Sequence, residues 1–336
     1  MNKIKIKSKL LDFFQLPLLK NFVSIWGHQC TVICFHRVIN DDTIHLEDGP
    51  NRNLCVTKTF FENLLIYLRK EFNVISIDEI KYITHLKKNK RYICITFDDG
   101  YIDNYLNAIP ILKKYKIPAT FFITNDFIDH KGIIWWYELW EILLKSNYLE
   151  FIFQKKHYSF KLNDKKKKIK SFYIIRKLIL NLDISNIEHL FNIITKNKVQ
   201  KSYSNYFMNW KQIIEIDKNN LFTIGSHTLS HPILKNETYE FVKKQMFFSK
   251  QILENKLKHE VKYIAYPFGG KHEANIREFN IAEDLGFEIG FTTNCKKEKN
   301  SNLFCVPRLL LIDYFQLNGI DVRLNGLSAF LGLQFG

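Results

Sequence analysis

The 336-residue sequence predicts an α/β protein built on a parallel sheet or barrel. Short runs rich in β-branched and aromatic residues alternate with segments that carry apolar residues at helical spacing, which is typical of repeated β–α units. The strand-like runs are almost continuously apolar, as expected for strands covered on both faces. Polar clusters follow several of these runs directly, at the strand ends where parallel α/β folds assemble their sites.

Strands and helices can be assigned in chain order from these patterns. Six segments have the composition of strands: Thr31–His36, Tyr92–Phe97, Ala119–Thr124, Leu221–Gly225, Tyr263–Tyr266 and Phe287–Thr292. Four segments have the spacing of amphipathic helices: Lys58–Lys70, Tyr101–Tyr115, Tyr239–Lys258 and Glu273–Leu285. Residues of about 132–208 interrupt the alternation and predict a mainly helical insertion. The predicted domain spans 31–336, and a basic, amphipathic segment, 1–30, precedes it.

The composition excludes several classes of protein. Apolar residues make up 46% of the chain, which is enough for a core and excludes a disordered protein. No stretch approaches the ~20 apolar residues that a spanning helix requires. Of the +15 formal charge, much lies in the lysine-rich segment 155–177, which has the composition of a solvated loop. Because no nucleic-acid-binding signature accompanies this charge, we expect an acidic or phosphorylated substrate or a lipid headgroup as partner, and no nucleic acid.

The cysteines and the N-terminus bear on location. Six cysteines without a CxxC pair favour reduced thiols and a cytoplasmic protein. The N-terminal segment starts with alternating lysines, but Asp12 and Lys20 interrupt its apolar run, so it fails as a signal peptide. Two interpretations stay open: the segment lies on an anionic membrane surface, at the inner face of the membrane, or it packs against the domain.

Two adjacent carboxylates, Asp98 and Asp99, follow the predicted strand Tyr92–Phe97. Two like charges at the end of a buried strand are costly unless a cation or a proton lies between them. The structural alternative is a helix cap, with Gly100 as the turn residue.

A histidine pair, His227 and His231, follows the predicted strand Leu221–Gly225. The spacing of four corresponds to one helical turn, so both imidazoles can face a single point. A cap and a structural histidine are the alternative. If both strands belong to one parallel sheet, the two motifs converge. Two imidazoles and one carboxylate then make a metal-ligand set with positions open for water and substrate, and the second carboxylate stays free to act as a base.

The TFDDG motif (Thr96–Gly100), taken with His227-Thr-Leu-Ser-His231, resembles the polysaccharide deacetylases, carbohydrate esterase family four. The segments NWKQIIEI, YIAYPFGG and LGFEIGFTT are also similar, and the resemblance covers about residues 30–130 and 208–310. It implies a distorted, incomplete (β/α)7-type barrel and a divalent metal, with zinc as the usual ion and cobalt or nickel as alternatives. It also implies that Asp98 is the catalytic base and that Asp99, His227 and His231 are the metal ligands.

Two departures from the family pattern affect the remaining roles. Many members hold the base aspartate with an arginine just before the Pro-aromatic-Gly motif, where this chain has Ala265 and Tyr266. Arg308 and Arg37 are the candidates to replace it, with a surface arginine as the alternative. The usual C-terminal acid histidine is also missing. His36 resembles the acid of a subgroup in which that strand has moved to the N-terminus, so we expect it to be the general acid, with a core histidine as the alternative.

Together these residues predict a metal-dependent hydrolase that removes an N-acetyl, or another N-acyl, group from an amino sugar. Pro267 and Phe268 are candidates for contact with the substrate, and the Phe268 N–H for donation to the oxyanion. We expect a nucleotide- or lipid-linked precursor of a surface glycan, because positive charge suits its phosphates. The alternative is a non-catalytic protein that retains the barrel to bind glycan or lipid.

Overall fold

The computed structural model describes residues 30–43, 49–85, 90–196, 203–270, 273–293 and 302–313, together with residues 320 and 324. Except for its last residue, the predicted N-terminal segment 1–30 lies outside the described residues. Among the helices of the described ranges, none combines the length and the apolar character that a membrane crossing needs.

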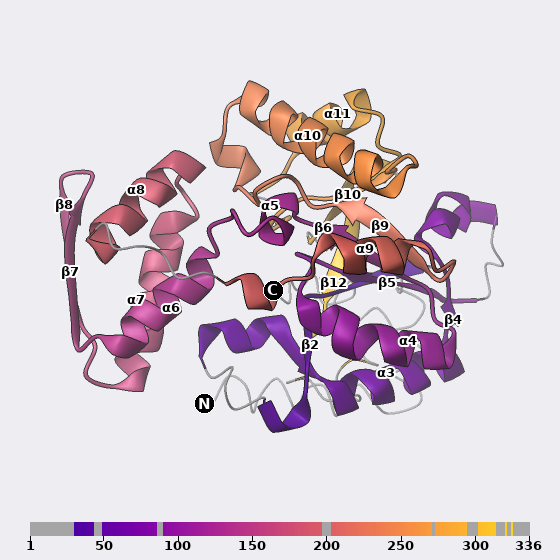
Figure 1. The fold of residues 1–336 in the computed structure, drawn as a ribbon, viewed down its shortest axis with the longest axis horizontal. Helices are drawn as coiled ribbons and strands as arrows, with labels where there is room; N and C mark the ends of the chain where they lie inside the picture. Colours follow the sequence, from indigo (N-terminus) through magenta and orange to yellow (C-terminus); the bar gives the residue numbers. More distant parts are fainter. Residues whose placement is uncertain are drawn as a thin grey trace, which may run out of the picture.

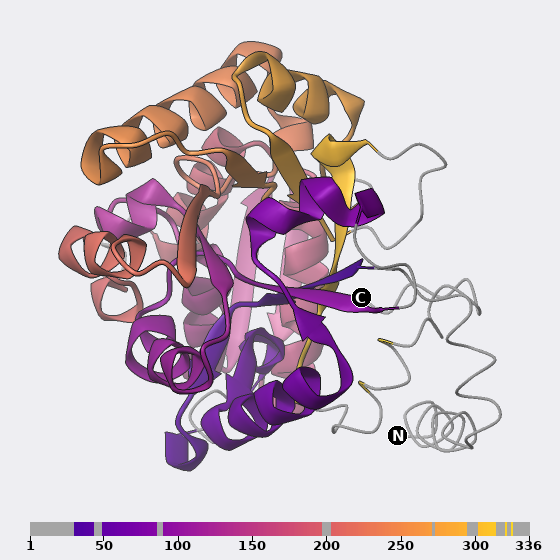
Figure 2. The same cartoon turned by 90° about the vertical axis from the view of Figure 1, so that its right-hand side faces the viewer.

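A ring of parallel strands forms the centre of the molecule (Figures 1 and 2). Its members are β1 (Cys30–Phe35), β5 (Tyr92–Phe97), β6 (Ala119–Ile123), β9 (Phe222–Ser226), β10 (Tyr263–Ala265), β11 (Ile289–Thr292) and β12 (Val306–Leu310). β1 pairs with both β5 and β12, and these two pairings close the ring. A further strand, β4 (Asn73–Val74), pairs with the start of β5. The predicted (β/α)7-type barrel is therefore confirmed.

Helices surround this ring, as the turned view in Figure 2 shows. They are α3 (Lys58–Glu71), α4 (Ile109–Tyr115), α9 (Trp210–Asp217), α10 (Tyr239–Leu257) and α11 (Ile276–Asp284), with the short α5 (Asn125–Ile128) after β6. Polar side chains start several of them. The Thr57 hydroxyl accepts from the Phe60 N–H at the start of α3, and Asn209 forms a capping box with Gln212 at the start of α9.

Two apolar clusters hold the barrel together. Alternate residues of each strand point to opposite faces, so Ile33 and Ile95 pack with the surrounding helices, whereas Val32, Cys94 and Phe122 belong to a separate, smaller cluster. We assign this smaller cluster to the interior of the ring, as in other (β/α) barrels. The interior of the ring is thus filled by apolar side chains, and the polar residues that follow the strands lie at the strand ends.

The insertion forms a lobe beside the barrel (Figure 1). It contains α6 (Trp135–Lys145), the antiparallel hairpin of β7 (Tyr148–Phe153) and β8 (Lys156–Lys161), α7 (Lys165–Ile179) and α8 (Ile184–Thr195). The hairpin was not predicted. The prediction of a solvated loop over 155–177 is wrong, because this segment is mostly β8 and α7. Asp164 caps α7, which buries Phe172, Ile175 and Ile179 and leaves most of its lysines in solvent.

All six predicted strands and all four predicted helices appear; Tyr92–Phe97 has its predicted limits, and the ends of the others are shifted. The predicted helix Tyr101–Tyr115 contains a π-helical segment, Asn104–Ala108, before α4. The strand β12 was not predicted, because Pro307 and Arg308 interrupt its short apolar pattern. The parallel strands β2 (Arg37–Ile39) and β3 (Cys55–Thr57) were not predicted either, because each is only three residues long.

Candidate metal and catalytic site

Three strand ends carry the predicted functional side chains. His36 follows β1, Asp98 and Asp99 follow β5, and His227 follows β9. Because all strands of the ring are parallel, these residues lie at the same end of the barrel.

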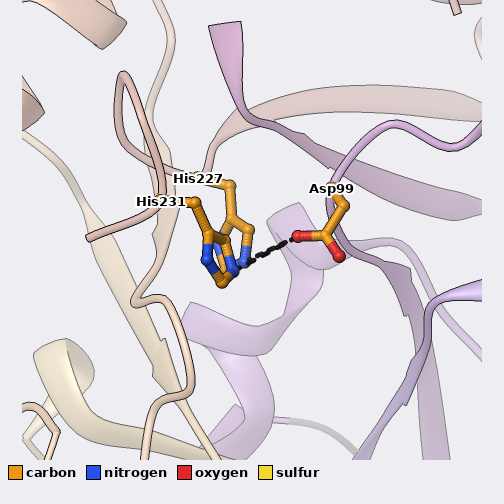
Figure 3. A group of neighbouring side chains, drawn as sticks. All are labelled: Asp99, His227 and His231. Carbon is orange, nitrogen blue, oxygen red and sulfur yellow. Dashed lines mark ion pairs between the residues drawn. The ribbon is translucent and has the colours of Figure 1, made fainter. Parts of the chain in front are cut away.

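Asp99, His227 and His231 converge on one point (Figure 3). The Oδ1 atom of Asp99 lies 3.5 Å from Nε2 of His227 and 3.4 Å from Nε2 of His231. A tetrahedral site with bonds of about 2.0–2.1 Å has ligand atoms about 3.3–3.4 Å apart. These two distances therefore fit a bound divalent cation, and one possible ligand atom of each of the three residues lies within 4.8 Å of the others.

The histidine pair converges by a different route from the one predicted. Residues 227–231 form a loop and not a helical turn. Thr228 and His231 adopt left-handed backbone conformations, with φ of 64° and 59°, and these turn the second imidazole back toward the first. Asp99 and Gly100 are also left-handed, with φ of 72° and 83°, so a glycine suits the second position.

Hydrogen bonding and burial leave the imidazoles ready to coordinate. Nδ1 of His227 lies 2.7 Å from the carbonyl oxygen of Ala265, which is consistent with a proton on Nδ1 and a free lone pair on Nε2. Burial lowers the pKa of His227, and burial together with the charge of His227 lowers the pKa of His231. Both rings are therefore neutral near pH 7, which is the form that binds metals.

The chemistry of Asp99 also fits a cation. Its Oδ1 atom is buried and has no hydrogen-bond partner. Burial, followed by the charge of Asp98, raises the pKa of Asp99, so a bare carboxylate here is costly. A divalent cation between Asp99 and the two imidazoles would remove that cost.

Asp98 lies in a different environment. Arg308 on β12 donates to both of its oxygens, from Nη1 to Oδ1 at 2.6 Å and from Nη2 to Oδ2 at 2.8 Å. The Cys34 thiol is 3.3 Å from Oδ2. Burial opposes ionisation, but the charge of Arg308, with a further contribution from His227, outweighs it and holds the pKa of Asp98 below its usual range. The side chain is thus a fixed carboxylate next to the candidate metal ligands.

His36, a half-buried residue at the end of β1, is the remaining titratable side chain of the candidate site. Burial lowers its pKa to about 4, against the opposing charge of Asp98. Its Nδ1 atom is buried without a hydrogen-bond partner. The imidazole is therefore neutral at pH 7 and has an unused polar atom.

The other predicted residues fall into two places. Phe268, directly after Pro267 and β10, has a left-handed backbone with φ of 62°, and its ring centroid lies 4.9 Å from that of His231. Arg37 pairs with Asp103, with Nε 2.7 Å from Oδ2. Since Arg308 is the arginine that pairs with Asp98, the geometry favours Arg308 over Arg37 for orienting that carboxylate.

Two residues at the site were not predicted from the sequence. Cys34 was not among the predicted site residues, although its place two residues before His36 puts it on the same face of β1 and at the same strand end. Trp136 of α6 was not among the predicted site residues either, and its ring centroid lies 5.4 Å from that of His231. Trp136 is buried, so it belongs both to the core and to the wall of the site.

A comparison of the sequence with models of protein families finds a match. The sequence model described as "Polysaccharide deacetylase" matches residues 85–152 and 174–290, which is more than half of the chain. The chain belongs to the polysaccharide deacetylase family. The unmatched stretch between the two matches lies inside the insertion.

Individual relatives are distant. YxkH from Bacillus subtilis is 24% identical over 207 residues, which cover 62% of this chain and 46% of YxkH. The chain thus spans about half the length of that relative. A Staphylococcus aureus relative, named poly-beta-1,6-N-acetyl-D-glucosamine N-deacetylase, is 23% identical over 273 residues, which cover 78% of this chain and 69% of the relative.

Solved structures share the fold. The deacetylase PplD from Streptococcus pyogenes, in complex with acetate, has a TM-score of 0.59 at 18% identity, over 88% of this chain and 97% of that one. IcaB from Ammonifex degensii has a TM-score of 0.55 at 17% identity, over 89% and 97%.

Proposed function

We propose that this polysaccharide deacetylase family member is a metal-dependent hydrolase that removes an N-acetyl, or another N-acyl, group from an amino sugar. One observation carries the proposal: two adjacent aspartates lie in opposite environments. Asp98 is held as a carboxylate by Arg308, whereas Asp99 directs an unpartnered oxygen at two imidazoles. Pairs of titratable groups with divergent environments are typical of active sites that divide their roles.

In this proposal Asp99, His227 and His231 hold the metal, with zinc as the expected ion. When bound, a divalent cation supplies Lewis acidity to the acyl carbonyl and makes water easier to deprotonate. Asp98 accepts the proton of the attacking water. Arg308 orients both oxygens of Asp98 and keeps it ionised before the reaction.

His36 and Phe268 serve the departing amine and the acyl oxygen. We assign His36 as the residue that gives a proton to the amine nitrogen. Because its imidazole starts neutral, it relays to the amine nitrogen the proton that Asp98 has taken from the attacking water, so that the proton count balances. The backbone N–H of Phe268 is the candidate donor to the acyl oxygen.

For the substrate we propose an N-acetylated amino sugar in a nucleotide- or lipid-linked precursor of a surface glycan. The +15 charge of the chain supports a substrate that carries phosphate. The name of the Staphylococcus aureus relative supports a polymer instead, so both belong in the test. A location in the cytoplasm, at the inner face of the membrane, follows from the precursor proposal.

We also propose that the chain divides into the segment 1–30 and a catalytic domain, 31–336, with an insertion of about 132–208. The gap that the family match leaves between 152 and 174 supports an insertion in this part of the chain.

Turnover and metal content test the proposed function together. The protein is loaded with zinc, cobalt or nickel in turn, and acetate release is measured from an N-acetylglucosamine oligomer and from a nucleotide-linked N-acetyl sugar. Asp98→Asn should lower kcat by about 10²–10⁴-fold and retain the metal, because the base is lost but the ligands remain. Asp99→Asn should lose the metal, and Asp217→Asn, at a surface pair with His259, should change neither.

Loss of metal from Asp98→Asn with retained turnover would contradict the assigned roles. If the unaltered protein binds the oligomer but hydrolyses neither substrate with any of the three metals, the non-catalytic glycan-binding alternative replaces the enzyme.

A further inference from the structure

A buried ion pair links the two strand-end segments that carry the proposed acid and the proposed base. Arg37 directly follows His36, and Asp103 lies four residues after Asp99. Nε of Arg37 is 2.7 Å from Oδ2 of Asp103, and the two residues are only 8% and 6% exposed. Separating the two charges would leave each of them buried and poorly solvated. The pair therefore keeps a fixed geometry.

The same helical segment holds the main chain after His36 at two further points. The second oxygen of Asp103, Oδ1, accepts from the Val38 N–H at 3.1 Å. Nδ2 of Asn107, one π-helical turn later, donates to the Val38 carbonyl at 2.7 Å. Backbone and side chain of β2 are thus tied to the segment that follows Asp98 and Asp99.

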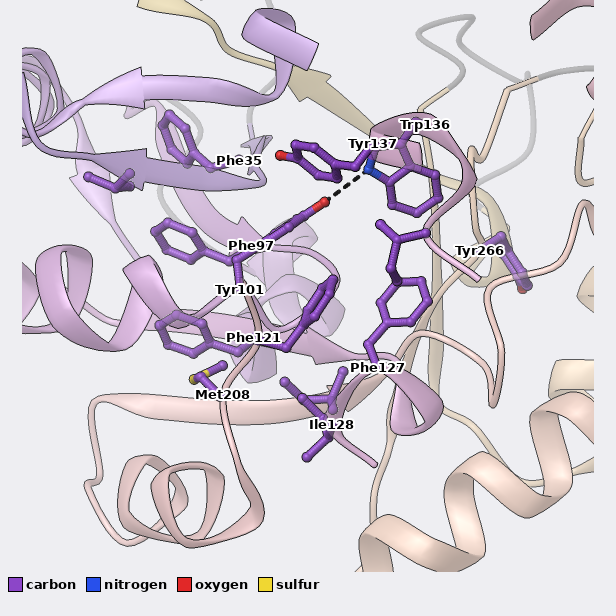
Figure 4. Close-up of a cluster of buried hydrophobic side chains, with 14 of the residues drawn as sticks. Phe35, Phe97, Tyr101, Phe121, Phe127, Ile128, Trp136, Tyr137, Met208 and Tyr266 are labelled. Carbon is purple, nitrogen blue, oxygen red and sulfur yellow. Dashed lines mark hydrogen bonds between the residues drawn. The ribbon is translucent and has the colours of Figure 1, made fainter. Parts of the chain in front are cut away.

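The insertion closes over this pair. Nη1 of Arg37 donates to the Tyr137 hydroxyl of α6 at 2.8 Å. The guanidinium carbon lies 5.3 Å from the ring centroid of Tyr101 and 5.0 Å from that of Tyr206, within cation–π distance. Figure 4 shows Trp136 and Tyr137 beside Tyr101, joined by the Trp136–Tyr101 hydrogen bond of 3.3 Å.

We infer that Arg37 is a positioning residue that fixes His36 relative to Asp98, and that the insertion stabilises this arrangement through Tyr137. The inference rests on the proposed function and gives Arg37 a role different from orienting Asp98. Proton delivery to a leaving amine requires precise placement, and a displacement of about 1 Å can cost about 10²-fold in rate. A lysine would provide the charge but not the planar fork that pairs with Asp103 and Tyr137 together.

Leaving-group dependence tests this role. Hydrolysis of an N-acetyl amino sugar needs protonation of the amine, whereas an aryl acetate releases a stable phenolate that needs no proton. Arg37→Met should lower kcat about 10²-fold for the amide, change it less than about threefold for the ester, and leave KM and metal content unchanged. His36→Ala should show the same split, and His36→Ala/Arg37→Met should be no slower than His36→Ala alone.

Two further variants test whether the effect of Arg37→Met is purely structural. Arg37→Met/Asp103→Asn leaves no unpaired buried charge and should keep the same amide-to-ester split. Arg277→Met removes the ionic partner of another buried carboxylate, Glu278 on α11; its other hydrogen bonds go to Leu234 and Glu237 and not to β2, so it should leave the split unchanged. Equal losses on both substrates, or an additive double variant with His36, would overturn the positioning role. Absence of turnover on both substrates in the unaltered protein would overturn the proposed function as well.

Discussion

At the scale of single residues, Asp98 and Asp99 show how two adjacent and identical side chains acquire different chemistry. Successive residues point in different directions, so one carboxylate faces Arg308 on β12 and the other faces the loop after β9. The charge of Arg308 lowers the pKa of Asp98 against the effect of burial, whereas burial, followed by the charge of Asp98, raises the pKa of Asp99. The sequence predicted the division of roles and left Arg308 and Arg37 as candidates to hold Asp98; only the structure decides between them, because Arg308 comes from a strand 210 residues further along the chain.

Removing Arg308 should destabilise the protein more than removing the whole ion pair. Arg308→Met leaves Asp98 as an uncompensated buried charge, which typically costs about 3–5 kcal/mol of the free energy of unfolding. Arg308→Met/Asp98→Asn removes both charges and should recover a large part of that loss. Urea denaturation of the two single variants and the double variant measures the coupling. Equal free energies for Arg308→Met and the double variant would contradict the buried-pair interpretation.

Glu138 of α6 should make stability depend on pH. Burial, with a smaller contribution from the charge of Glu141, raises its pKa to about 7. A carboxyl group with a raised folded pKa favours the native state while it is protonated, and this contribution is lost as the pH rises from about 4.3, the unfolded value, to about 7. Relative to the unaltered protein, Glu138→Gln should therefore gain stability with increasing pH over this range, by at most about 4 kcal/mol.

Thermal denaturation between pH 4.5 and 8 measures this gain. The control is Glu188→Gln on α8, an exposed position, which should show no trend relative to the unaltered protein. A gain that is the same at both ends of the range would refute the pH argument.

At the scale of elements, the local sequence patterns predicted the positions of strands and helices well, but they predicted the loops poorly. The strands leading to the site appear within one or two residues of their predicted limits, because their apolar runs end in polar residues. The loop after β9 differs from its prediction, since a spacing of four residues does not specify a helical turn and the left-handed Thr228 and His231 leave no such mark. The prediction of a solvated loop over the basic segment 155–177 failed for a similar reason. Its many lysines dominate the composition, although Phe172, Ile175 and Ile179 form a buried apolar face of α7.

The start of α9 is an element-scale test, because this helix leads into β9 and the histidine loop. Asn209 accepts from the Gln212 N–H, and the Gln212 side chain accepts from the Asn209 N–H. Asn209→Ala should lower the free energy of unfolding by about 1 kcal/mol, whereas Asn209→Asp should retain most of it, since aspartate caps as well. Chemical denaturation distinguishes them, and equal losses would argue against the capping role.

At the scale of the whole molecule, the ring closes only where β1 meets β12. β1 lies between β5 and β12, so His36 comes from near the start of the described residues and Arg308 from near their end. This closure places both beside Asp98. The insertion adds Trp136 and Tyr137 at the same end of the barrel.

The net charge gives a prediction about the whole protein. A chain of charge +15 attracts an anionic substrate, and dissolved salt screens that attraction. We expect kcat/KM for a nucleotide-linked N-acetyl sugar to fall by up to about tenfold between low and high ionic strength, and kcat/KM for an uncharged oligomer to stay nearly constant. Steady-state kinetics over a salt series measures both. A flat profile for the nucleotide-linked sugar would remove the support that charge lends to a phosphate-bearing precursor.

The amino-acid sequence alone was sufficient for the β–α alternation, for the motifs with Asp98, Asp99, His227 and His231, and for the family resemblance. These properties are local, because strand patterning and strand-end motifs occupy short stretches of chain. The pairing of Arg308 with Asp98, the separate pairing of Arg37 with Asp103 and the approach of Trp136 to His231 required the folded molecule. Contacts of this kind depend on strand register and barrel closure, which join residues far apart in the chain and leave no pattern in any one segment.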